Sequence, residues 1–261
     1  MINLTQGQLM AWLGEWFWPF VRIAACFSVA PVFGTAFVPA RVKIALAGFM
    51  AYLLGPLLPP LPDVALLSLE GVQIIAQQIL IGLGVGLILQ LAFDAVGLGG
   101  QLIANSMGLS FAFNVDPLRG ASTAAVGQFY LVLMVLTFLI LDGHLALIQL
   151  LVEGFRSLPV GIEGLGAEGL WGMVMIGGIL FAGSVQIALP ALTALMVANL
   201  AFGLISRAAP TLNIFSVGFP ISLVFGLVVL QLSLPGVQQG FIELMRQSML
   251  EASLLQQGAG R

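Results

Sequence analysis

Long uncharged apolar segments dominate the chain and restrict what it can fold into. A helix needs about 20 apolar residues to cross the hydrocarbon core of a bilayer. About six segments approach or exceed that length by this criterion, at residues 16–33, 42–58, 71–93, 124–151, 170–198 and 214–234. Backbone groups in lipid must pair within their own segment, and the short alternating segments of a membrane barrel are missing. The sequence therefore predicts an all-α membrane protein.

The scarcity of charge supports this prediction. Charged residues make up 7% of the 261 residues and hydrophobic residues 60%, whereas soluble domains carry roughly a quarter charged residues. With 11 acidic and 8 basic residues, the chain offers no basic surface for nucleic acid. The single cysteine, Cys26, lies in an apolar run and is expected to be a small buried residue.

Breaks between the segments are marked by proline, glycine and polar residues. The run LLPPLPD at 57–63 cannot continue a helix. After Pro235, the tail at 237–257 places Phe241, Leu244, Met245 and Met249 at helical spacing. This spacing predicts a short amphipathic helix against the membrane or a partner. The first segment is expected to remain in the mature protein, because no basic residue precedes it as in a signal peptide.

Glycines occur inside the apolar segments, and Gly82 and Gly86 lie four residues apart. Small residues at this spacing let helices approach closely in lipid. The same glycines, together with Pro19, Pro190 and Pro220, also permit kinks. Ordinary tight packing explains any one glycine, while the total number favours kinked helical hairpins that pack against many neighbours.

No arrangement of residues suited to catalysis or to metal binding is recognisable, so neither an enzymatic activity nor a cofactor is expected. His144 is the only histidine of the chain, which prevents a histidine-based metal site. Asp142 and His144 could form a proton relay at membrane depth. Without further titratable groups along a path, the favoured interpretation is that both lie at a helix end.

Polar residues inside the apolar segments are rarer. Gln73 and Gln77 lie four apart on one helical face, and Arg22 lies within the first segment. Such groups face protein or water rather than acyl chains. Hydrogen bonding between helices and the lining of a wet lumen are equally consistent with the pattern.

The loop at 105–122 is the most unusual stretch of the sequence. It carries four apolar side chains, Met107, Leu109, Phe111 and Phe113, in a polar and glycine-containing context. Because these side chains are costly to leave in water, we expect them to be buried. One possibility is an apolar constriction that excludes ions, and the other is a re-entrant turn packed on its own chain.

Several stretches resemble the FliR family of flagellar export-gate proteins, and the injectisome component of type III secretion more loosely. They are RIAACFSVAPVFGTAFVPARVKIALA (22–47), DPLRGASTAAVGQFY (116–130), FLILDGHLALI (138–148), SLPVG (157–161) and ANLAFGLISRAAPTLNIFSVGFP (198–220). One departure is Thr211, where glutamine is common in the family.

This resemblance implies a non-enzymatic subunit in the bacterial inner membrane, within the flagellar basal body. Such a subunit assembles with FliP and FliQ into a helical, pore-forming export gate to which FlhB attaches, and exported flagellar proteins are its substrates. The loop would then be a plug with Met107, Leu109, Phe111 and Phe113 as its apolar stoppers. The polar residues implied in packing and inter-subunit contacts are Arg22, Arg41, Lys43, Asp116, Arg119, Asp142, His144, Arg207 and Asn213.

The main alternative is a transporter of small molecules or ions. That function predicts converging charges near the membrane midplane and two similar halves. The sequence contains no convincing internal repeat and no cluster of charges within the apolar segments.

Overall fold

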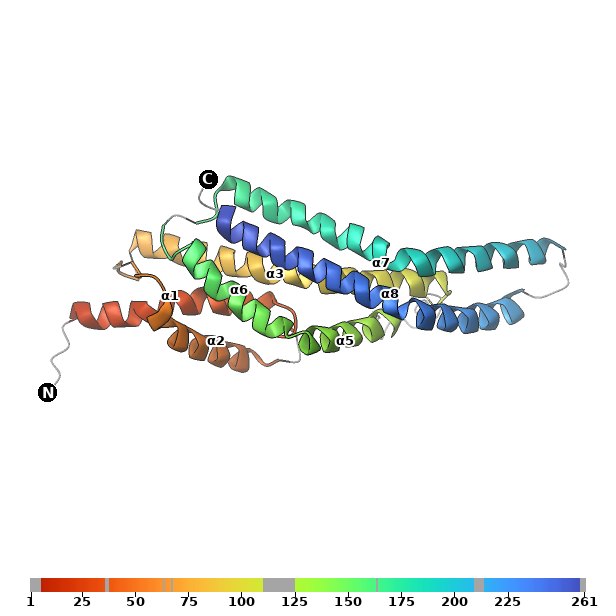
Figure 1. Ribbon diagram of the computed structural model, residues 1–261, viewed down its shortest axis with the longest axis horizontal. Coiled ribbons are helices and arrows are strands. Elements are labelled where there is room, and N and C mark those ends of the chain that lie inside the picture. Colours follow the sequence, from red (N-terminus) through yellow and green to blue (C-terminus); the bar gives the residue numbers. More distant parts are fainter. Residues whose placement is uncertain are drawn as a thin grey trace. The chain divides into compact units, whose positions relative to one another are not determined.

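The computed structural model describes residues 6–35, 38–62, 64–66, 68–109, 125–162, 164–208 and 214–258. All the regular structure in these ranges is helical, which confirms the predicted all-α class. The elements are α1 (Gln6–Val29), α2 (Ala40–Leu54), the 3-10 turn η1 (Gly55–Leu57), α3 (Leu69–Ser106), α5 (Ala125–Ile140), α6 (Gly143–Ser157), α7 (Ala167–Ala208) and α8 (Ile214–Gly258) (Figure 1).

Each predicted apolar segment coincides with helical structure, but fewer helices qualify as membrane spans than expected. In the described ranges four are long and apolar enough to cross a membrane, or five if α5 and α6 form one broken span. The predicted segment 124–151 is bent by 65° between those two helices. At the bend, Asp142 takes a left-handed backbone conformation with φ 55°, which a non-glycine residue seldom adopts inside a helix.

The two C-terminal helices are longer than predicted. Pro190 lies inside α7, and Pro220 and Pro235 lie inside α8. The tail after Pro235 is therefore the last part of α8 and not a separate short helix. Phe241, Leu244 and Met245 are buried within the protein itself, whereas Ile242, Leu250 and Leu254 are exposed. The amphipathic character of the tail stays a prediction. The sequence analysis treated Pro235 as a break, whereas long helices often accommodate proline with a kink.

The chain divides into two compact units, and several helices contribute to both. The first unit contains residues 1–91, 138–177 and 246–261, and the second contains residues 92–137 and 178–245. α3 is the most buried of the candidate spans. In its most apolar stretch of 18 residues, 61% of the residues are buried, compared with 22% for α7 and 28% for α8. The predicted organisation as one membrane-embedded subunit stays a prediction.

In the first unit, α1 and α3 contact each other closely through Gly82 and Gly86. A Cβ atom added at Gly82 would collide with the Arg22 carbonyl oxygen and lie 2.9 Å from the Ala25 Cβ. At Gly86 it would lie 2.7 Å from the Cys26 carbonyl oxygen. The predicted role of these glycines in close packing is confirmed, and Cys26 is buried as expected.

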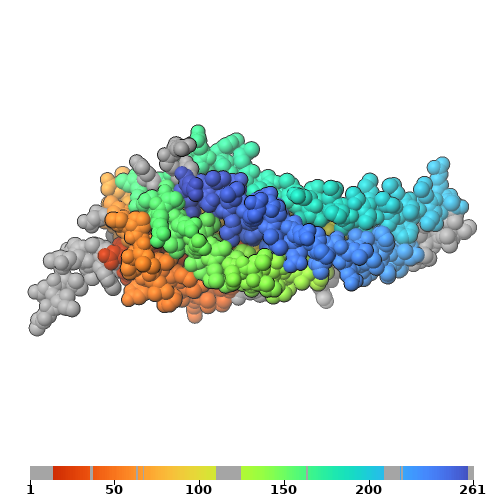
Figure 2. Space-filling view, in the orientation of Figure 1, coloured from red at the N-terminus to blue at the C-terminus, as the bar shows by residue number. Residues whose placement is uncertain are grey.

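In the second unit, glycines again allow close approach of α3 to its neighbours. A Cβ at Gly100 would lie 2.7 Å from the Gly127 Cα of α5, and one at Gly99 would lie 3.0 Å from the Ser184 carbonyl oxygen of α7. The Phe93 and Phe241 rings meet edge to face at 4.9 Å between centroids. The residues of α7 and α8 in this unit contact each other, and they largely cover residues 92–106 of α3 in the view of Figure 2.

We predict that Gly82→Ala destabilises the protein by about 2 kcal/mol, since the added methyl group must displace the backbone of α1. The matched control is Gly177→Ala in α7, where nothing lies within 4 Å of the added Cβ. This control should be neutral or stabilising by up to about 1 kcal/mol, because alanine favours the helix over glycine. Thermal unfolding in detergent measures both variants, and equal effects would contradict the packing described.

Candidate functional site

Arg22 of α1 is the most buried charged residue of the described chain, with 0% of its side chain exposed. Its Nε donates to Gln78 Oε1 of α3 at 2.6 Å, and its Nη2 donates to the Leu158 carbonyl oxygen at 2.9 Å. Its Nη1 donates to the Gly154 carbonyl oxygen at 3.2 Å, and the guanidinium lies 4.2 Å from the Phe155 ring centroid. Arg22 therefore joins α1, α3 and the end of α6 within the first unit.

The partners of Arg22 are neutral, and two of them belong to a helix C-terminus. The carbonyl groups in the last turn of a helix lack intrahelical partners and carry partial negative charge. Leu158, just past the end of α6, supplies such a carbonyl, whereas the Gly154 carbonyl oxygen also accepts from the Leu158 backbone N–H at 2.9 Å. Hydrogen bonds to these oxygens offset part of the free-energy cost of transferring the guanidinium from water to the protein interior, a cost that would be prohibitive for an unpaired charge. The arrangement holds helices together and exposes no reactive atom.

The space around this cluster is filled by glutamines. A Cβ at Gly154 would collide with the amide of Gln256, and one at Gly164 would collide with Gln77. Gln77 Oε1 also accepts from the Leu165 backbone N–H at 3.1 Å. Gln78, through Arg22, and Gln77, through Leu165, therefore form hydrogen bonds between parts of the first unit, one of the two interpretations left open by the sequence. Gln73, on the same predicted face as Gln77, is exposed.

The other predicted polar residues do not join this cluster. Arg41, Asp142 and Arg207 are exposed. Lys43 Nζ donates to the Gly34 carbonyl oxygen at 2.9 Å, and His144 is partly buried with Nδ1 unpaired among the described residues. In the described part of the chain, no hydrogen bond joins Asp142 to His144. The residues outside the described ranges are Asp116, Arg119 and Asn213.

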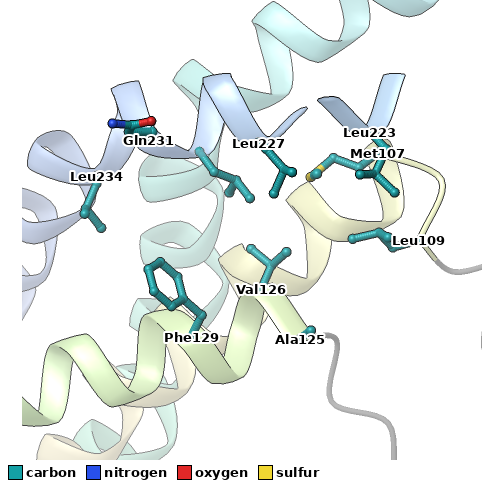
Figure 3. A pocket seen from close by; sticks show the side chains of 10 residues that line it. Met107, Leu109, Ala125, Val126, Phe129, Leu223, Leu227, Gln231 and Leu234 are labelled. Atoms are coloured by element: carbon teal, nitrogen blue, oxygen red, sulfur yellow. The ribbon is translucent and has the colours of Figure 1, made fainter. Parts of the chain in front are cut away.

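The described part of the predicted plug lies in the second unit. Met107 is 1% exposed, and Leu109 is partly buried. Both line a cavity of about 420 Å³ formed with the start of α5 and the middle of α8 (Figure 3). The cavity is lined by Met107, Leu109, Ala125, Val126, Phe129, Leu223, Leu227, Leu230, Gln231 and Leu234. Phe111 and Phe113 lie outside the described residues.

Met107 is anchored on α8 through a glycine. A Cβ at Gly226 would lie 2.6 Å from Met107 Cγ, so the thioether side chain occupies the space that a larger residue would fill. One residue earlier in the chain, the Ser106 carbonyl oxygen accepts a hydrogen bond from Asn199 Nδ2 of α7 at 3.1 Å. The end of α3 is thus fixed to both α7 and α8, and Leu109 follows at the edge of an apolar space.

Sequence reasoning missed Asp94, a carboxylate in the middle of α3, where the chain is apolar enough to span a membrane. The sequence does indicate this residue, because an ionisable side chain within a membrane-spanning helix is by default a candidate functional residue. Asp94 and Gln101 line a second cavity of the second unit, of about 310 Å³, with Gly97, Leu98, Gly127, Leu131 and Leu180. In the described ranges, no group of three or more His, Cys, Asp or Glu side chains could hold a metal ion.

We predict that Arg22→Ala destabilises the protein by about 3 kcal/mol, because it removes the donor that Gln78 Oε1 and the Leu158 carbonyl oxygen share in the buried cluster. Arg41→Ala, at an exposed position of α2, is the control and should leave the melting temperature in detergent unchanged. An unchanged melting temperature for Arg22→Ala would show that the cluster does not hold the helices together.

Comparison with known proteins identifies the family. Residues 13–248 match the family of bacterial export proteins, family 1. The chain is similar to the flagellar biosynthetic protein FliR of Pectobacterium carotovorum subsp. carotovorum, with 41% identity over 235 residues and 90% of each chain covered. For FliR of Escherichia coli strain K12 the identity is 39%, again with 90% of each chain covered. FliR of Bacillus subtilis strain 168 is 29% identical, covering 81% of this chain and 82% of the relative. This chain therefore belongs to the FliR family of bacterial export proteins, as a membrane-embedded component of flagellar protein export.

Proposed function

We propose that this chain forms part of the wall and the apolar constriction of the protein-conducting pore of the flagellar export gate. In this proposal it assembles with FliP and FliQ in the bacterial inner membrane, and FlhB attaches to the assembly. Its contribution is structural, and the energy for export comes from other components.

The observation that carries the proposal is the placement of Met107 and Leu109. Both side chains lie at the end of a long membrane helix, beside a cavity whose lining contains one polar residue, Gln231. An apolar constriction stops ions because they cannot shed their hydration shells there. Met107 packs against Gly226. In this proposal that contact is kept when an exported chain passes through the constriction.

The exposed apolar surface supports assembly with other subunits. In α7 of the second unit, Phe181 is 66% exposed, Met196 65% and Leu204 70%. Lipid can cover some of this surface, but α7 also carries Gly203, beside which nothing lies within 4 Å. Small residues next to large apolar ones are typical of surfaces on which further helices pack in membranes.

We predict that replacing Leu109, Phe111 and Phe113 together with serine raises ion leakage through the assembled gate. The substitutions remove apolar side chains from the plug segment and leave Met107 on Gly226, so assembly should be unaffected. The measurement is ionic current through purified gate complexes in planar bilayers. The control replaces the same three residues with methionine, which keeps the segment apolar and should keep the current at its original level.

Unchanged current in serine-substituted complexes of normal composition would contradict the constriction. Deletion of residues 107–113 is a poorer test, because it also removes the buried contact of Met107 with α8.

A further inference from the structure

The exposed residues of α3 in the second unit are all polar. Between residues 92 and 106, each of which the structure describes, the exposed residues are Asp94, Gln101 and Asn105. The other residues of this part are buried or partly buried. We call Asp94, Gln101 and Asn105 the α3 polar face.

The three residues form one line along the helix. Positions i, i+7 and i+11 fall within about 40° of one another around a helix of 3.6 residues per turn. At 1.5 Å rise per residue the line is about 16 Å long, roughly half the thickness of the hydrocarbon core. A lipid-facing surface of this length would not carry a carboxylate and two amides, because polar groups in a span face protein or water.

Neighbouring helices of the same unit expose a mixture of apolar and polar side chains. Val132 of α5 is 58% exposed, Phe181 of α7 66% and Leu232 of α8 76%, and Gln128 of α5, Gln186 of α7 and Gln238 of α8 are exposed as well. Among residues 92–106 of α3, by contrast, no exposed residue is apolar. The α3 polar face therefore differs from the surfaces of its neighbours in exposing no apolar side chain.

A hollow lies beside the α3 polar face. Asp94 and Gln101 line the cavity of about 310 Å³, which is bounded by Gly127 and Leu131 of α5 and by Leu180 of α7. Gly97 and Gly127 border this cavity at the place where α3 and α5 are in close contact. It has room for several water molecules and polar groups for them to bond.

We propose that the α3 polar face lines the aqueous path taken by the exported unfolded polypeptide through the gate. This inference rests on the proposed function as a pore subunit. Gln101 and Asn105 carry neutral amides that can form hydrogen bonds with a passing polypeptide. Such groups do not select one type of side chain, which suits a path for exported proteins of different sequence. The face also ends two residues before Met107, so it leads along α3 to the apolar constriction.

The test is photocrosslinking to a substrate arrested in transit. A photoreactive benzoylphenylalanine is placed at Gln101 or at Asn105 in the full export apparatus, and an exported flagellar protein fused to a tightly folded domain is used to jam the gate. Illumination should produce adducts with the arrested substrate from both positions. The matched control is the same label at Val132, an exposed apolar position of the same unit, which should give no substrate adduct.

A label at Leu109 separates the two proposals. Substrate adducts from Leu109 but none from Gln101 or Asn105 would overturn the inference while the pore function stands. Adducts from the α3 polar face to other gate subunits alone would also overturn the inference and mark this face as an interface between subunits. Absence of substrate adducts from all three positions would contradict the proposed function itself.

Discussion

Direct contact between helix backbones at glycine is the interaction on which the rest of the structure depends. In a membrane there is little hydrophobic drive for helices to associate, so dispersion contacts and hydrogen bonds must hold them together. Gly82 and Gly86 bring α3 against the backbone of α1. The carbonyl oxygen next to Gly82 belongs to Arg22. The Arg22 side chain donates hydrogen bonds to Gln78, one turn earlier in α3, and to the end of α6. Close approach and buried hydrogen bonding therefore reinforce each other at one place.

Glycines also determine how the helices of the second unit pack. Glycines in α3, α5 and α7 remove bulk where helices of the second unit meet, and Gly226 receives Met107. This packing leaves Met107 and Leu109 at the edge of a cavity.

Much of the fold could be predicted from the sequence, because the constraint of lipid on backbone hydrogen bonds leaves helix as the default. The packing role of Gly82 and Gly86 followed from their spacing alone. The partners of Arg22 could not be predicted, since they lie 56, 132 and 136 residues away and depend on how helices meet. The segment at 124–151 was predicted as one span because apolar residues resume after Asp142-Gly143-His144, although the expected position of Asp142 and His144 at a helix end is what the structure shows. The continuity of α8 was missed because Pro235 was taken as a break.

The composition of the complex extracted from the membrane tests the central claim, that this chain works as one subunit of a larger pore. The measurement is native mass spectrometry of the tagged chain, purified in mild detergent from cells that express it together with FliP and FliQ. We predict a large hetero-oligomer that contains all three chains in fixed proportion. A tagged chain recovered as a stable monomer, or as an oligomer of itself alone, would contradict it.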